Sequence, residues 1–180
     1  MKETWIKRLY VAALALFGLG LILTVVSWLR LCSDACEEVH FYRFYGMLFE
    51  PLGMVFFLVG GFFHWMSQKS KWYGYAASLM VAGAIGAELN LIRVQKFVIG
   101  HWCPVCLSIA TVIFLIGAVY VALFILTKGF NMKKGITTCL FLLMGFAVAY
   151  VGVFKPEQSF ADGIEGGAED PAFGNKKSSI

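Results

Sequence analysis

Four of the five cysteines of this chain fall into two pairs whose spacing suits thiol–disulfide chemistry. Cys103 and Cys106 form a CxxC motif at the start of a long apolar run, and Cys32 and Cys36 lie in a polar segment upstream. At a helix N-terminus, unpaired backbone N–H groups favour a thiolate on the first cysteine, and Pro104 suits the first turn because its missing N–H would have no partner there. Disulfide exchange needs a thiolate and a good leaving group. The motif therefore predicts a redox-active pair.

The same cysteines allow two other interpretations. Together with His101 they offer a full set of zinc ligands, and a disulfide among them would only staple an outer loop. A Cys-x-x-x-Cys pair beside a membrane CxxC is uncommon for structural zinc, and a helical membrane bundle folds without a metal. The sequence therefore favours redox chemistry and predicts no metal. Cys139 lies apart from both pairs and is expected to be a small packed apolar residue.

The composition indicates that lipid is the solvent of most of the chain. Hydrophobic residues make up 59% of it and charged residues 14%, against roughly 25% charged residues in ordinary globular domains. A helix needs about 20 mostly apolar residues to cross the hydrocarbon core. Five runs meet or approach this length, at 6–29, 52–66, 72–92, 104–126 and 135–154. The sequence predicts an all-α integral membrane protein whose first helix is retained and not cleaved as a signal peptide.

Lysine and arginine residues are distributed unevenly between the two sides of the predicted membrane segment. The N-terminus and the loops after the second and fourth runs are basic, whereas the segment around Cys32 and Cys36 is acidic. Because basic loops stay on the cytoplasmic side, the N-terminus is expected inside and both cysteine pairs outside, where disulfides persist. Five crossings place the polar tail, 155–180, outside as well. The net charge of +4 reflects this bias, and no nucleic-acid binding is expected.

The stretch FVIGHWCPVCLS, from Phe97 to Ser108, resembles the segment that leads into the active-site helix of the vitamin K epoxide reductase family, and of its bacterial branch in particular. A second match lies in the outer loop and its continuation, where a cysteine, a valine and two glycines agree with the family. These residues are Cys36, Val39, Gly46 and Gly53. Cys32 takes the place of the other loop cysteine. The resemblance covers roughly residues 14–126.

The resemblance implies a four-helix transmembrane bundle around a quinone of the ubiquinone or menaquinone type, with the fifth helix peripheral. It also implies that a periplasmic thioredoxin-like (DsbA-like) protein passes electrons to Cys32 and then Cys36, which exchanges with Cys103, while Cys106 faces the quinone. Such a protein resides in the bacterial inner membrane and generates periplasmic disulfides, as DsbB-type proteins do. In some members the thioredoxin-like domain is fused after the fifth helix, and the segment 170–175 resembles the approach to it.

Two polar residues, Glu88 and Asn90, lie near the outer end of the third apolar run. A carboxyl group at membrane depth is a candidate functional group because its burial requires compensation. Glu88 is therefore a candidate proton relay to the quinone, and Asn90 a candidate contact to it. The alternative, which the sequence favours, is that Glu88 reaches the outer interface and pairs with Arg93 or Lys96. His64, at the end of the second run, is expected to be an inner interfacial residue.

Overall fold

The computed structural model describes residues 2–29, 42–127 and 132–154. Within these residues the chain forms six helical segments and two very short strands. The helical segments are α1 (Lys2–Trp28), α3 (Phe49–Met66), α4 (Lys71–Val94), the π-helical turn η2 (Gln95–Ile99), α5 (Pro104–Leu126) and α6 (Met132–Gly152). The strands are β1 (Arg43–Phe44) and β2 (Val153–Phe154).

Five helices are long and apolar enough to cross a membrane, namely α1, α3, α4 continued through η2, α5 and α6. Their solvent-facing surfaces remain largely apolar, which suits lipid as the surrounding medium. The prediction of an all-α, multi-pass membrane protein is confirmed at this level. The second helix begins at Phe49 and not at the expected residue 52, so it includes Glu50 and Pro51 in its first turn.

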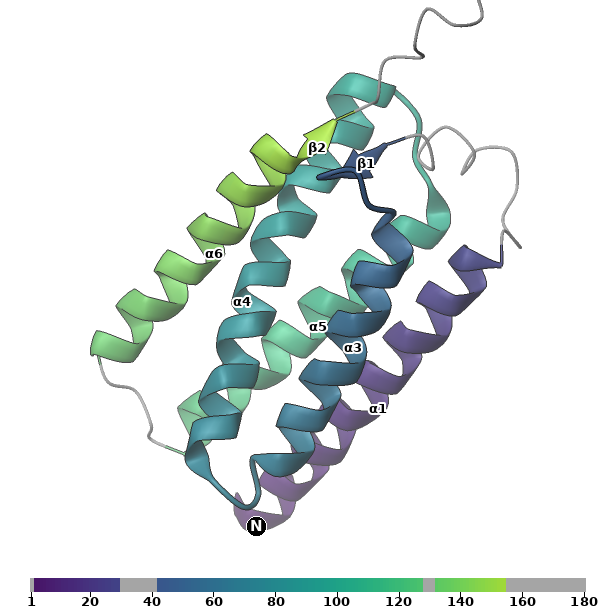
Figure 1. Cartoon of the computed structure of the whole chain (residues 1–180). Coiled ribbons are helices and arrows are strands. Elements are labelled where there is room, and N and C mark those ends of the chain that lie inside the picture. Colours follow the sequence, from purple (N-terminus) through teal and green to yellow (C-terminus); the bar gives the residue numbers. More distant parts are fainter. Residues whose placement is uncertain (1, 30–41, 128–131, 155–180) are drawn as a thin grey trace, which may run out of the picture.

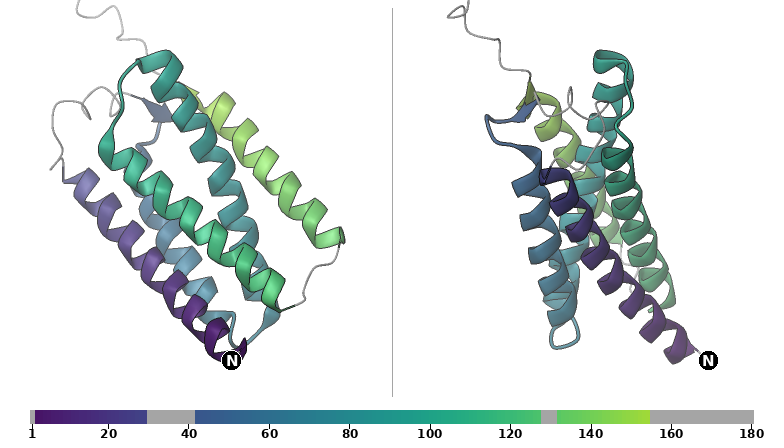
Figure 2. Two further views of the ribbon diagram at one scale, coloured as in Figure 1. Left: turned by 180° about the vertical axis from the view of Figure 1, so that it is seen from behind. Right: turned by 90° about the vertical axis from the view of Figure 1, so that its right-hand side faces the viewer.

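Consecutive membrane-spanning helices run in opposite directions along the bundle (Figure 1). α1 packs on α3 and α5, and α4 packs on α3, α5 and α6. α1 and α6 lie at opposite edges of the molecule, as both Figure 1 and the left view of Figure 2 show. The N-terminus and the turn between α3 and α4 lie at one end, called here the N-terminal end. The start of α5, with Cys103, lies at the other end, called the Cys103 end.

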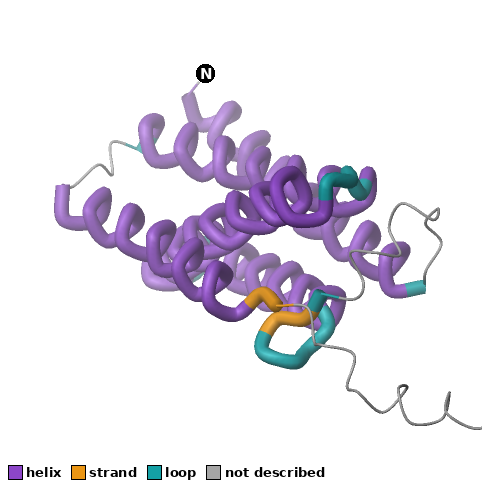
Figure 3. The backbone as a smooth tube through the Cα atoms, turned by 90° about the horizontal axis from the view of Figure 1, so that it is seen from above, coloured by secondary structure: helices purple, strands orange, loops and turns teal. Residues whose placement is uncertain are grey.

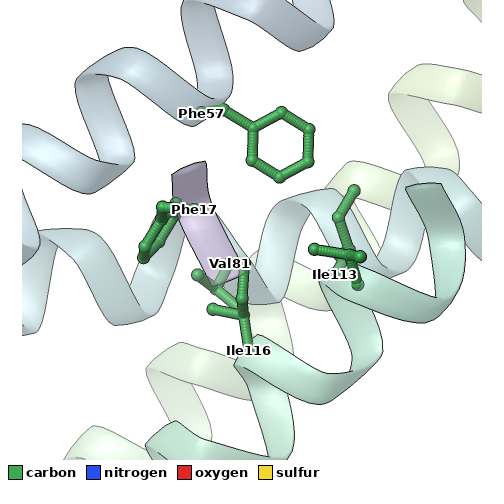
Figure 4. Close-up of a cluster of buried hydrophobic side chains, with 6 residues drawn as sticks. Phe17, Phe57, Val81, Ile113 and Ile116 are labelled. Carbon is green, nitrogen blue, oxygen red and sulfur yellow. The ribbon is translucent and has the colours of Figure 1, made fainter. Parts of the chain in front are cut away.

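The core between α1, α3, α4 and α5 is a cluster of interlocking apolar side chains (Figure 4). Phe17 from α1 and Phe57 from α3 each lie over a glycine of the other helix, because a Cβ on Gly20 would collide with Phe57 and one on Gly60 with Phe17. Ile116 from α5 completes this contact and is fully buried. Close packing of this kind holds membrane helices together where lipid removes the hydrophobic driving force.

α6 approaches α4 even more closely than the other helices approach each other. A Cβ on Gly145 would collide with the carbonyl oxygen of Gly83, and one on Gly86 would collide with that of Leu142. Small residues at such positions allow two backbones to come into contact. The fifth membrane helix is thus fixed to α4 through its backbone.

The two strands join the end of α6 to the segment before α3. β1 and β2 pair antiparallel, with Arg43 opposite Phe154 and Phe44 opposite Val153, and Figure 3 shows them side by side at the Cys103 end. A tight turn follows β1, in which Tyr45 and Gly46 have φ values of 49° and 82°. The Tyr45 N–H donates to the carbonyl oxygen of Gly152 at 2.9 Å. The sequence analysis did not anticipate this connection.

His64, which was expected to be an inner interfacial residue, is buried between helices at the N-terminal end of the bundle. It is 1% exposed, and its ring stacks on Tyr10 at a centroid distance of 4.2 Å. Its Nε2–H donates to the backbone oxygen of Tyr10 at 3.0 Å, since a carbonyl oxygen can only accept. In the neutral ring Nδ1 then accepts from the Tyr120 hydroxyl at 2.8 Å. The imidazole therefore joins α1, α3 and α5 with both nitrogens satisfied.

Candidate functional site

The two cysteines of the CxxC motif lie at the first turn of α5. Cys103 is the N-cap residue, with an extended backbone (φ −88°, ψ 113°), and Pro104 occupies the first helical turn. The N–H of Cys106 donates to the sulfur of Cys103 at 3.4 Å. Cys103 is 2% exposed, and Cys106 is partly buried. An N–H aimed at the sulfur, together with the helix dipole, stabilises a thiolate on Cys103 relative to the thiol.

The chain that leads into α5 is held by Gln95, the first residue of η2. Its backbone oxygen accepts from the N–H of Gly100 at 2.9 Å, and Gly100 takes the left-handed conformation with φ 76°. The side-chain Oε1 of Gln95 accepts from the backbone N–H of Cys103 at 3.4 Å. One residue therefore closes the loop and fixes the backbone at the first cysteine.

Both cysteines line a cavity of about 410 Å³ at the Cys103 end of the bundle. Its wall is mainly apolar and comes from every long helix. The apolar lining includes Phe56, Phe57, Met80, Leu91, Ile109 and Ile113. Ligand sites in proteins have this character, with a mostly apolar wall and a few polar groups.

Few polar side chains reach this cavity, and the charged ones are both carboxyl groups. Glu50, from the first turn of α3, is 7% exposed, and Glu88, from α4, is partly buried. Both line the cavity, as do Gln95, Thr24 and the aromatic residue Tyr42. The Thr24 hydroxyl donates to the backbone oxygen of Gly20. Among the lining residues of the described chain, none is a lysine or arginine.

α6 forms part of the cavity wall, although it was expected to be peripheral. Gly145, Val148 and Ala149 line the cavity, together with Val153 of β2. The close contact of α6 with α4 and the pairing of the two strands account for this position. The fifth helix thus contributes directly to the candidate site.

The surroundings of Glu88 and Asn90 differ from the expected ones. Within the described residues Glu88 forms no ion pair; the Arg93 guanidinium instead lies over the Tyr150 ring at 4.8 Å, and the Lys96 ammonium lies over Phe97 at 5.2 Å. Asn90 is 1% exposed and accepts a hydrogen bond from Arg93. It is not among the residues that line the cavity. Glu88 therefore remains a candidate residue of the site, whereas Asn90 is not among the residues that line it.

The remaining sequence-predicted residues fall into two groups. Cys32, Cys36 and the tail, 155–180, lie outside the described residues. His101 is exposed in the loop before Cys103. Cys139 is exposed on α6 and is not the packed residue that was expected.

Glu50 and Gln95 line the cavity but were not predicted as site residues from the sequence. Each is a polar residue at one end of an apolar run, so the argument that identified Glu88, a polar group at membrane depth that needs compensation, would have identified both. No polar residue in the sequence of α6 indicates in this way that the helix contributes to the cavity wall.

The fold and the site together define a multi-pass, all-α membrane protein with a CxxC pair on the wall of an apolar, carboxyl-bearing cavity. Comparison of the chain with models of protein families, with curated proteins and with solved structures gives no match. The function is therefore argued from the site.

Proposed function

We propose that this protein is a membrane thiol–disulfide oxidoreductase that generates disulfides in a partner protein and passes the electrons to a quinone. The observation that carries the proposal is the position of Cys103 and Cys106, which line one apolar cavity at the first turn of a membrane-spanning helix. A dithiol placed there reaches a lipid-soluble ligand, and it lies at the end of the helix where exchange with a soluble thiol is feasible.

The residues around the cavity fit a quinone of the ubiquinone or menaquinone type. The cavity volume of about 410 Å³ lies within the usual range for ligand sites, roughly 300–1,000 Å³. Ile109, Ile113 and Phe56 would hold the ring. When bound, the quinone supplies a two-electron acceptor that becomes a hydroquinone, while the two thiols lose two electrons and two protons and form the Cys103–Cys106 disulfide.

The chain's own groups then have distinct tasks. The Cys106 N–H donates to the Cys103 sulfur, which favours the thiolate form of Cys103, and Cys106 lies on the ligand side. Glu88 lines the cavity without an ion pair in the described chain, which favours a proton relay over the interfacial pair. General acid–base groups of this kind contribute about 10²–10⁴-fold to rates.

The remaining steps follow the resemblance to the vitamin K epoxide reductase family. A periplasmic thioredoxin-like protein, separate or fused, would transfer its electrons to Cys32 and Cys36, and the Cys36 thiolate would attack Cys103 and break the Cys103–Cys106 disulfide. The net reaction converts the partner dithiol and the quinone into a disulfide and a hydroquinone. Under this proposal α1, α3, α4 and α5 surround the quinone, α6 is the fifth helix, and the N-terminus lies in the cytoplasm of a bacterial cell.

The proposal is tested with purified protein in lipid nanodiscs, supplied with a reduced thioredoxin-like donor and a quinone. We expect quinone reduction that depends on the donor and on Cys103. In a Cys106→Ala variant, Cys103 loses its resolving partner, and peptide mapping is expected to find a Cys36–Cys103 disulfide. A wild-type protein that leaves the quinone oxidised with every donor would contradict the proposed function.

A further inference from the structure

The side chain of Gln95 lines the cavity next to the cysteine motif. It is 4% exposed, its Oε1 accepts from the N–H of Cys103 at 3.4 Å, and it belongs to the cavity wall. A carboxamide has an acceptor oxygen and a nitrogen with two donor hydrogens. Because the oxygen is used toward Cys103, the nitrogen presents the donors on the other side of the group.

The Nε2 of Gln95 has no acceptor within the described residues. Every fully buried side-chain nitrogen or oxygen in that part of the chain has a hydrogen-bond partner, so the Nε2 must keep accessible surface. The cavity is the space that Gln95 lines. An amide donor that faces an apolar cavity is unfavourable until an acceptor reaches it, and the acceptor is therefore expected on the ligand.

We propose that the Nε2 of Gln95 donates a hydrogen bond to a carbonyl oxygen of the cavity ligand and thereby selects an apolar ligand that carries a carbonyl group next to the dithiol. This inference rests on the proposed function, because a quinone supplies such carbonyl oxygens. Through its Oε1 the same side chain fixes the backbone of Cys103. Gln95 is thus a positioning and specificity residue that sets the ligand and the first cysteine relative to each other.

Three other polar groups of the wall are less suited to this contact. Glu50 and Glu88 accept but do not donate when they are ionised, and the Thr24 hydroxyl already donates to the backbone of its own helix. The Gln95 amide is uncharged and remains a hydrogen-bond donor at every pH, because it does not titrate. Ser27 and Tyr42 bring hydroxyl groups to the same wall. Gln95 differs from them because its carboxamide also accepts from the backbone N–H of Cys103.

Equilibrium binding of two probes of similar shape tests the inference. Menadione carries two ring carbonyls, and methylnaphthalene has none. In Gln95→Met, which keeps the volume and removes both polar functions, we expect menadione to bind about 2- to 10-fold more weakly, the equivalent of one lost hydrogen bond, with methylnaphthalene unchanged. Gln68→Met, at an exposed glutamine in the turn at the N-terminal end, is the matched control and should bind both probes as the wild type does.

A second measurement uses the wild-type protein alone, so that it holds even if Gln95→Met does not fold. The infrared carbonyl stretch of bound menadione should lie at lower frequency than that of menadione in a hydrocarbon solvent. An unshifted stretch, or equal weakening of both probes in Gln95→Met, would overturn the role of Gln95 while leaving quinone reduction intact. Failure of the wild type to bind menadione at all would overturn this inference and the proposed function together.

Discussion

The two ends of the bundle place their buried polar side chains in different surroundings. At the N-terminal end the His64 ring has a hydrogen-bond partner at each nitrogen, Tyr10 on one side and Tyr120 on the other. At the Cys103 end, Gln95, Glu50 and Glu88 line a cavity together with the dithiol. A polar group in a membrane requires compensation. The neighbouring helices supply it to both ring nitrogens of His64, whereas at the Cys103 end several polar side chains border a cavity that can hold a ligand.

This difference separates structural polar groups from functional ones. A saturated network rigidifies the bundle and has no remaining capacity for a ligand. A polar wall around an apolar cavity keeps that capacity. Substitutions at the Cys103 end are therefore expected to change turnover or ligand affinity, and substitutions at the N-terminal end to change stability.

The largest effect is expected for the dithiol itself. Cys106→Ser removes one of the two sulfurs that form the disulfide, so donor-dependent quinone reduction should fall to background while the helical content stays that of the wild type. Cys139→Ser is the matched control, because Cys139 is exposed on α6 and is not part of the cavity wall. Full turnover in Cys106→Ser would remove that residue from the mechanism.

A smaller loss is expected for the carboxyl group of the wall. Glu88→Gln keeps the size and the hydrogen bonding of the side chain but removes its titratable proton. If Glu88 relays protons, quinone turnover should fall about ten- to a thousandfold, in line with the loss of a positioned acid or base. Thiol exchange with the donor protein should be unaffected, since it needs no proton from the cavity.

The control for this change is Glu3→Gln, at an exposed carboxyl of the N-terminal end. Stopped-flow measurement of quinone absorbance follows quinone reduction separately from thiol exchange with the donor protein. Turnover of Glu88→Gln equal to that of the wild type at every pH would remove Glu88 from the mechanism.

The contact between α6 and α4 should affect stability and ligand affinity together. Gly145→Ala places a Cβ against the Gly83 carbonyl, and such overpacking lowers the free energy of unfolding by about 1–3 kcal/mol. Because Gly145 also lines the cavity, menadione should bind more weakly. At Gly18 a Cβ meets no atom within 4 Å, so Gly18→Ala should leave both quantities unchanged. If Gly145→Ala weakened menadione binding no more than Gly18→Ala does, α6 would have no part in the ligand site.

The smallest effect is expected in the saturated network. Tyr120→Phe removes the hydroxyl that binds His64 Nδ1 and should lower the free energy of unfolding by about 0.6–2 kcal/mol, the range measured for polar contacts between membrane helices. Turnover per folded molecule should remain that of the wild type. A double-mutant cycle of Tyr120→Phe with His64→Phe measures the coupling free energy between the two side chains. A large loss of turnover without a loss of stability would extend the functional region to the N-terminal end.

Much of the fold followed from the sequence, because hydropathy over about 20 residues is a strong signal for a membrane helix. The position of Cys103 at a helix N-terminus also followed, since Pro104 marks the first turn. The burial of His64 did not, because the apolar run around it has the same composition whether it faces lipid or a neighbouring helix. Its partners come from residues 54 and 56 positions away.

The candidate site could be predicted only in part. The CxxC motif and Glu88 stand out by residue type, whereas the pairing of β1 with β2 involves two residues of each strand and leaves no periodic pattern. That short pairing and the contact of Gly145 with Gly83 bring α6 to the cavity. Both depend on backbone approach across distant parts of the chain, which composition does not encode.

The most direct test of the central claim is a single-turnover experiment without oxygen. Fully reduced Cys36→Ser protein, in which the loop pair cannot form a disulfide and so cannot reduce the Cys103–Cys106 disulfide, is mixed with a limiting amount of quinone. The hydroquinone formed is compared with the thiols lost, which peptide mapping assigns to individual cysteines. The account predicts two thiols lost for each hydroquinone formed, with the new disulfide joining Cys103 and Cys106. Hydroquinone formed while Cys103 and Cys106 both remain thiols would contradict it.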